Sequence, residues 1–435
     1  MKKLFLIYSG IIILLSAACD DFLKEENYSS VIATELYSTQ SGYEGLVNTC
    51  YSSLREIYGN EAWIFCAGTD MYVEGRSNQP EGLSEYYNLN ATDKFVLDFY
   101  SNLYETIQLC NTAVYYNDKT EESGTLSQRL AEVRFLRAFA YFKLLQHFGG
   151  VSIVTEMIDE PIISIERKSA EEVYAFIISE LENVFTDLPE SASDFGRASK
   201  RAVNHYLAKV YLTRGYESFG IANDFITAAN YAETAINNQG LNLTYSEVFF
   251  PGNENNEEII FSVQYGAESI VDVSRDGNLQ NYYFGPYLGS NGNEEGYPQR
   301  SYNLCATKYV LDLYTESDSR WEASFMNVIY ERYYDYFDRA DERDQLVVTE
   351  YYPHYWELDE IDAWQAASPL RADATIYPYS DSWEASTASY ADRMLPAIKK
   401  FDDPTSVFSN DGSSTRDIFL ARLGETYLIA AEAYF

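Results

Sequence analysis

The sequence has little positive charge, few histidines and few cysteines. Its 435 residues contain 31 Lys and Arg against 67 Asp and Glu, which gives a formal net charge of −36 at pH 7. A protein this acidic repels phosphate backbones and offers no basic stripe, so we expect no nucleic-acid partner. Disorder is also excluded, because 46% hydrophobic and 16% aromatic residues supply ample material for a core.

The motifs of common catalytic and metal sites are missing as well. The three histidines, His147, His205 and His354, have no HExxH context, and neither a GxSxG nor a Walker sequence occurs. Neighbouring carboxylates arise by chance among 67 acids, so they do not indicate glycosidase chemistry. The segment NDGSSTRD only weakly imitates a calcium-binding loop. The sequence therefore predicts no catalytic residue, no metal site and no cofactor.

The five cysteines form neither a CxxC pair nor a Cys/His cluster, which argues against a zinc or thioredoxin-like site. Apart from Cys19, the cysteines are Cys50, Cys66, Cys110 and Cys305. They either form disulfides, for which three connectivities exist, or remain thiols. Cys50 and Cys110 lie within helical patterns, and this position favours buried thiols.

No run of about 20 apolar residues occurs, so no segment is long enough to span a bilayer. A shorter apolar run over residues 4–15 follows two lysines and ends in small residues just before Cys19. This pattern is typical of a signal peptide over residues 1–18. We expect a lipoprotein signal, after which Cys19 is acylated and anchors the chain to a membrane; the alternative is an ordinary secretory signal cleaved near Ala18.

Helical periodicity dominates the first half. Apolar residues recur at helical spacing over 41–57, 93–117 and 127–148. Ser169 and Glu172 form a capping box ahead of a further helix, which Pro189 ends. Two more helices are predicted at KRAVNHYLAKVYLTRG, closed by Gly215, and FITAANYAETAINNQG, closed by Gly240.

The short breaks between these helices predict a mainly α fold. We expect tetratricopeptide-like helical hairpins stacked into a right-handed superhelix, and the alternative is an unrelated helical bundle. After residue 240, EEIIFSVQY predicts a short strand, and loops are expected to about residue 300. Residues 330–400 are dense in Tyr, Asp and Trp without periodicity. The second half is therefore expected to be loop-rich and irregular, with a few short strands.

The last fifteen residues, ARLGETYLIAAEAYF, predict an amphipathic helix. This helix stops without a glycine, a cap or a polar tail, which is unusual for the end of a natural helix. We therefore expect the natural chain to continue past Phe435.

Several blocks of sequence occur in an order that resembles one protein family. They are CDDFL, GTDMY, RFLRAFAYFKLLQHFGGVSIVTE, RKSAEEVYAFIISELENVFTDLP, GRASKRAVNHYLAKVYLTRG, EEIIF, YVLDLYTESDSR, KKFDDP and RLGETYLIAAEA. The chain from Cys19 to Phe435 resembles the SusD/RagB family of outer-membrane nutrient-binding lipoproteins. The third block, which spans residues 134–156, carries the most specific resemblance.

The resemblance implies an organisation, a location and a function. The chain would comprise a signal peptide at 1–18, a lipidated tether at 19–34 and one SusD-like domain at 35–435. It would be anchored in the outer membrane of a Gram-negative bacterium and face the cell exterior. There it would bind oligosaccharides, without catalysis, and deliver them to a SusC-like TonB-dependent transporter.

The resemblance also places the ligand contacts in two segments, residues 71–90 and 280–289. Sugar binding needs flat aromatic faces for pyranose rings, and amide, carboxylate or guanidinium groups for hydroxyls. The predicted ligand-binding residues are Tyr72, Arg76, Asn78, Tyr86, Tyr87, Tyr282, Tyr283 and Tyr287. Adjacent tyrosines often place one ring in the core and one outside, so the alternative is that at least half of these rings are structural.

Two other functions remain open at this point. The same family includes peptide binders, and a Tyr-rich acidic site suits cationic peptides. The other alternative is a secreted glycoside hydrolase with a helical fold. Trp356, Trp364 and Trp383 lie outside both predicted binding segments. They either line a further wall of the site or pack the irregular region, and we favour packing.

Overall fold

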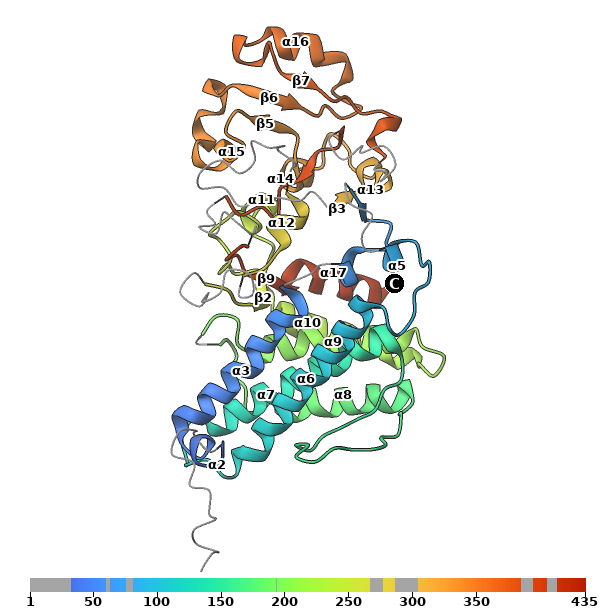
Figure 1. Ribbon diagram of the computed structural model, residues 1–435, viewed down its shortest axis with the longest axis vertical. Coiled ribbons are helices and arrows are strands. Elements are labelled where there is room, and N and C mark those ends of the chain that lie inside the picture. Colours follow the sequence, from blue (N-terminus) through green and yellow to red (C-terminus); the bar gives the residue numbers. More distant parts are fainter. Residues whose placement is uncertain are drawn as a thin grey trace, which may run out of the picture.

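The computed structural model describes residues 33–59, 63–75, 81–192, 194–266, 277–285, 304–384, 394–404 and 413–435. A lower helical region comprises α2 (Ala33–Tyr37), α3 (Gln40–Tyr58), α6 (Lys94–Asn117), α7 (Leu126–Phe148), α8 (Ala170–Val184), α9 (Lys200–Gly215) and α10 (Ala222–Ile236) (Figure 1). These helices confirm the ones predicted from periodicity. The predicted signal peptide, Cys19 and nearly all of the tether lie outside the described residues.

The helical region packs around α7, which is buried along most of its length. Phe135, Phe139 and Phe142 are at most 2% exposed, and they share one core with residues of α3, α6, α8 and α9. The helix α7 packs mainly against α6 and α8, and α9 packs against α10. Neighbours along the chain are therefore neighbours in space, as expected for helical hairpins, and the mainly α fold class is confirmed.

Two helices end earlier than the sequence predicts. The helix α8 ends at Val184, five residues before Pro189, because the chain turns there and Asp187 N donates to Val184 O at 3.3 Å. The helix α10 ends at Ile236 and not near Gly240. Asn237 takes a left-handed conformation with φ of 47°, a conformation that asparagine tolerates better than most residues.

Buried ion pairs fix α7 against its neighbours. The fully buried Glu132 side chain on α7 accepts from Arg129 at 2.6 Å and from Arg197, just before α9, at 2.8 Å. Glu180 on α8 accepts from Arg137 on α7 at 2.5 Å. Loss of one partner from such a buried pair costs about 3–5 kcal/mol, so these contacts strongly favour one arrangement of the helices.

A strand pair and the last helix connect the two regions of the molecule. The predicted strand is confirmed as β2 (Ile259–Val263), which pairs antiparallel with β9 (Ile418–Arg422). The helix α17 (Leu423–Tyr434) follows and packs on α10 and α9 (Figure 1). His205 of α9 is fully buried there, with Nδ1 2.8 Å from Thr426 Oγ1.

The upper region consists of short elements. Its α-helices are α4 (Trp63–Cys66), α5 (Glu81–Ser84), α11 (Tyr245–Val248), α12 (Gln280–Phe284), α13 (Lys308–Asp312), α14 (Arg320–Ser324), α15 (Asp335–Asp338) and α16 (Ile361–Ala366). Its strands are β1 (Tyr72–Glu74), β3 (Leu304–Ala306), β4 (Phe325–Met326), β5 (Val328–Tyr330), β6 (Val348–Tyr351), β7 (Thr375–Ile376) and β8 (Ala397–Ile398). Among the described residues of this region, 3₁₀ helices span Ala340–Gln345, Leu358–Glu360, Pro369–Arg371 and Asp381–Trp383.

The strands of the upper region pair as β1 with β3, β4 with β8, and β5 with β6 and β7. The last of these is a three-stranded sheet over residues 328–376, most of which falls in the segment that the sequence describes as lacking periodicity. Periodicity does not reveal it because each strand has only two to four residues.

Tryptophans pack the upper region, as we favoured from the sequence. Trp383 is fully buried, and its ring stacks on Trp321 at a centroid distance of 6.2 Å. The Trp356 ring stacks on His354 at 3.8 Å, and the Trp364 ring stacks on Tyr351 at 4.0 Å.

The cysteines described by the structure are free thiols, which confirms the interpretation as thiols over disulfides. Cys50, Cys110 and Cys305 are buried, and Cys66 is half-buried. No helix in the described ranges combines the length and the apolar character needed to cross a bilayer.

Candidate functional site

The two segments predicted to bind ligand meet in the upper region. Strand β1 holds Tyr72 opposite Ala306 of β3, and Thr307 N donates to Met71 O at 3.1 Å. The Tyr72 ring also packs edge-on against Phe284 of α12, with centroids 5.3 Å apart. Segments 71–75 and 280–285 therefore lie side by side, although they are far apart in sequence.

Three of the predicted tyrosines lie within this junction rather than on its surface. Tyr283 is 9% exposed, and its ring centroid lies 5.0 Å from that of Trp63. Tyr282 is half-buried, with its ring 5.2 Å from Tyr283. Tyr72 is half-buried too, and burial raises the pKa of its phenol, which stays protonated at neutral pH. These positions suit packing of the junction, above all for Tyr283.

Tyr86 and Tyr87 are the exposed aromatic side chains of the first predicted segment. They follow α5 and are 64% and 63% exposed. The expectation that one ring of an adjacent pair is buried is therefore wrong for this pair. Tyr86 has φ of 56°, and its hydroxyl donates to Gly68 O at 2.5 Å. The Tyr86 side chain is thus held at its backbone and at its hydroxyl, while most of its surface remains exposed to solvent.

Gly68, the first residue of the GTDMY block, lies at a position that favours glycine. Its φ is 70°, which favours glycine, and a Cβ at this position would collide with the carbonyl oxygen of Leu83. The same Cβ would crowd the Tyr86 hydroxyl. Glycine at this position therefore permits the contact that orients Tyr86.

Arg76, Asn78 and Tyr287 lie outside the described residues. The sequence reasoning did not include Tyr309, which lies on α13 directly after β3 and is 56% exposed. A local sequence signal for its position was available, namely the helix cap at Thr307. Thr307 Oγ1 accepts from Val310 N at 3.2 Å, and this cap places Tyr309 in the first turn of α13.

Charged groups beside Tyr309 are already paired. Lys308 Nζ donates to Asp312 Oδ2 at 2.9 Å and to the Tyr379 hydroxyl at 2.7 Å. Within the described ranges, no group of three His, Cys, Asp or Glu side chains is placed to hold a metal ion. The arrangement offers aromatic faces and hydrogen-bonding groups, which are the elements of a binding surface.

Comparison with known families gives two matches that together cover most of the chain. Residues 21–212 match a model described as "Starch-binding associating with outer membrane", and residues 257–435 match one described as "SusD family". The chain belongs to the SusD/RagB family. The candidate site lies where these matches meet in space, since Tyr86 falls in the first and α12, β3 and α13 fall in the second.

Relatives of this SusD/RagB chain include two curated proteins. A "SusD-like protein" of Bacteroides ovatus is 28% identical over 282 residues, which are 61% of this chain and 50% of the relative. The "Starch-binding protein SusD" of Bacteroides thetaiotaomicron is 27% identical over 345 residues, which are 74% of this chain and 57% of the relative. The chain thus spans little more than half the length of these relatives.

A solved structure shows the same fold. A "Laminarin binding SusD-like protein" superimposes with a TM-score of 0.68 at 22% identity, covering 92% of this chain and 81% of that one. At this identity the likeness establishes the SusD/RagB fold of the chain and leaves its ligand to be inferred from its own residues.

Proposed function

We propose that this protein binds oligosaccharides at the cell surface without catalysis. The observation that carries the proposal is the pair of exposed rings at Tyr86 and Tyr87, of which Tyr86 is held by its hydrogen bond to Gly68 O, close to the junction of β1, β3 and α12. The names of two similar proteins, a starch-binding protein and a laminarin-binding protein, support a glycan as the ligand class.

Conformational cost supports a binding role for this turn. A residue other than glycine with φ near 56° costs on the order of 1–3 kcal/mol, and such strain gathers at functional sites. The strained turn at Tyr86 leaves the rings of Tyr86 and Tyr87 exposed to water instead of buried. Tyrosine offers an apolar face to a pyranose ring and a hydroxyl to its polar groups, so the arrangement suits a sugar chain lying across both rings.

Anchoring and handover complete the proposal. Cys19 carries the lipid that attaches the protein to the outer membrane, and the cargo passes to a TonB-dependent transporter. These two steps are supported by the family resemblance and by the outer-membrane association in the description of the matching family.

The test is glycan binding by the full chain and by the double variant Tyr86→Ala/Tyr87→Ala. Each stacking contact contributes about 0.5–1.5 kcal/mol, so loss of both should weaken binding about tenfold. Affinity electrophoresis against starch, laminarin and other soluble glycans identifies the ligand, and titration calorimetry with the best one gives the affinity.

Tyr115→Ala is the matched control. Tyr115 is 43% exposed near the far end of α6, away from the site, so this variant should bind like the wild type. Retention of a peptide with no response to any glycan would overturn the proposal, as would release of reducing sugar by the purified protein. An equal loss of glycan affinity in the double variant and in Tyr115→Ala would show that Tyr86 and Tyr87 are not part of the site.

A further inference from the structure

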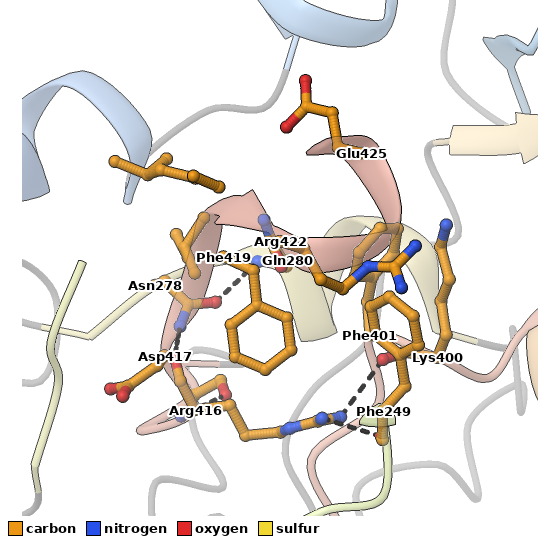
Figure 2. A pocket seen from close by; sticks show the side chains of 14 residues that line it. Phe249, Asn278, Gln280, Lys400, Phe401, Arg416, Asp417, Phe419, Arg422 and Glu425 are labelled. Carbon is orange, nitrogen blue, oxygen red and sulfur yellow. Dashed lines mark hydrogen bonds between the residues drawn. The ribbon is translucent and has the colours of Figure 1, made fainter. Parts of the chain in front are cut away.

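A separate pocket of about 210 Å³ lies where residues 400–401, strand β9 and the start of α17 come together (Figure 2). Side chains that line it include Phe249, Gln280, Lys400, Phe401, Phe419 and Arg422. Two features stand out in a chain of net charge −36: the pocket contains several cations, and it has aromatic walls.

Two of its three cations are paired with an acidic side chain. Arg416 Nε donates to Glu254 Oε1 at 2.6 Å, and the same guanidinium donates to the backbone oxygen of Asp402 at 2.6 Å. Arg422 Nη1 donates to Glu258 Oε2 at 2.9 Å. Arg416 is therefore a structural clamp, whereas the rest of the Arg422 guanidinium remains on the pocket wall.

The two acids that line the pocket are engaged elsewhere. Glu425 accepts from Lys209 Nζ at 2.5 Å, and Figure 2 shows its carboxylate directed away from the pocket. Asp417 accepts from Tyr265 N at 2.9 Å and from Gln264 Nε2 at 2.7 Å. Neither acid neutralises the pocket.

Lys400 is left without a counterion. Among the residues that the structure describes, no carboxylate oxygen lies within 4.0 Å of its ammonium nitrogen. Its contacts are aromatic, with Nζ 4.7 Å from the Phe401 centroid and 5.6 Å from the Phe249 centroid. Burial lowers the pKa of Lys400 to about 8, and the positive charge of Arg422 lowers it as well. An anion bound beside Lys400 would stabilise its charged form against both effects.

The remaining walls indicate the body of the ligand. Phe401 and Phe419 supply apolar faces, and the side-chain amide of Gln280 makes no hydrogen bond to any described residue. A pocket of about 210 Å³ is smaller than the roughly 300–1,000 Å³ of sites for drug-sized ligands, which points to a single ring. A ring with an apolar face, hydroxyls and one negative charge meets all these conditions.

We propose that this pocket binds a uronic acid unit, with its carboxylate between Lys400 and Arg422 and its ring against Phe401 and Phe419. Figure 2 shows the Lys400 and Arg422 side chains on the same side of the pocket, beside Phe401. A single carboxylate suits these two cations, because Glu258 already neutralises part of the Arg422 charge.

The pocket is distinct from the surface of Tyr86 and Tyr87, and packed rings connect it to the junction of β1 and α12. Phe401 lies 4.6 Å from Phe284, which in turn contacts Tyr72. The proposal does not depend on glycan binding at the surface tyrosines, and glucuronate binding should be unchanged in Tyr86→Ala/Tyr87→Ala.

The test uses the full chain and four probes in titration calorimetry: D-glucuronate, its methyl ester, D-glucose and inorganic phosphate. Glucuronate should bind at least tenfold more tightly than the ester and glucose, because both lack the charge that pairs with Lys400. Equal binding of glucose and glucuronate would overturn the proposal, and so would binding of phosphate without glucuronate. These comparisons need no variant and so do not depend on the folding of one.

A pair of variants then locates the site. Lys400→Gln should weaken glucuronate binding about tenfold, whereas Lys399→Gln should leave it unchanged. Lys399 is the matched control because burial lowers its pKa to about 8 as well, yet it does not line the pocket. Gln280→Ala provides a second lining variant that keeps the charge, and it should weaken glucuronate binding severalfold. Equal binding by all variants would place the uronate elsewhere.

Discussion

Glu425 connects the last helix to α9 and makes the stability of the protein depend on pH. Its Oε1 accepts from Lys209 Nζ at 2.5 Å, and its Oε2 lies 3.4 Å from His205 Nε2. Burial alone would raise the pKa of Glu425, but the contacts with His205 and Lys209 outweigh it and hold the pKa at about 2. Because the unfolded chain protonates at about pH 4.3, the contact stabilises the fold above that pH.

We therefore predict that Glu425→Gln lowers the free energy of unfolding at pH 7 and that this loss shrinks as the pH falls from about 4.5 toward 2. Urea unfolding of both proteins at pH 7, 5, 4 and 3 measures the difference. Glu190→Gln is the control, since this side chain is 83% exposed in its pair with Lys200 and such pairs contribute little. A loss in Glu425→Gln that stays constant at every pH would contradict the linkage.

At the residue scale, the sequence could indicate which segments form the candidate site but not which of their rings face water. Tyr86 and Tyr283 both belong to adjacent tyrosine pairs in predicted binding segments, yet one is 64% and the other 9% exposed. The difference arises from the backbone of the turn after α5 and from the position of Trp63, and both depend on tertiary structure. Lys400 was not singled out at all, because its lack of a counterion is a property of the folded environment.

At the element scale, the capping box of α8 allows a clean test of helix stability. The Ser169 hydroxyl oxygen accepts from Glu172 N at 3.2 Å, and Glu172 Oε2 accepts from Ser169 N at 2.9 Å. We predict that Ser169→Ala costs about 0.5–2 kcal/mol and Ser169→Gly only a few tenths, measured by urea unfolding followed at 222 nm. Ser179→Ala, at an exposed position inside the same helix, should change stability by less than about 0.5 kcal/mol. An equal loss in Ser169→Ala and Ser179→Ala would show that the cap contributes nothing specific.

Local signals such as this cap explain why the long helices could be predicted. From α3 to α10, the six long helices have 15 to 24 residues each, which is enough for several periods of apolar spacing. The strands β5, β6 and β7 have two to four residues, and their pairing joins residues 328, 351 and 376. No local pattern encodes such a sheet, since its stability comes from contacts such as Trp364 on Tyr351.

At the scale of the whole molecule, the two regions differ in how they are held together. The helical region has one large continuous core, whereas no described element of the upper region exceeds six residues. Short elements have little stability of their own, so the upper region depends on its tertiary contacts. The chain offers separate probes for the two regions, because Trp63, Trp321, Trp356, Trp364 and Trp383 are all five of its tryptophans and all lie in the upper region.

We predict that the upper region unfolds at lower urea concentration than the helical region. Tryptophan emission should then change before the ellipticity at 222 nm, which reports mainly on the long helices, when both are recorded on the same samples. The strand pair of β2 with β9 and the clamp of Arg416 on Phe249 O at 2.8 Å connect the regions, so the two midpoints should be separated but close. If the fluorescence and ellipticity curves instead superimpose with equal slope, the links between the regions make the molecule one cooperative unit. A single shared transition requires that neither core remains folded without the other.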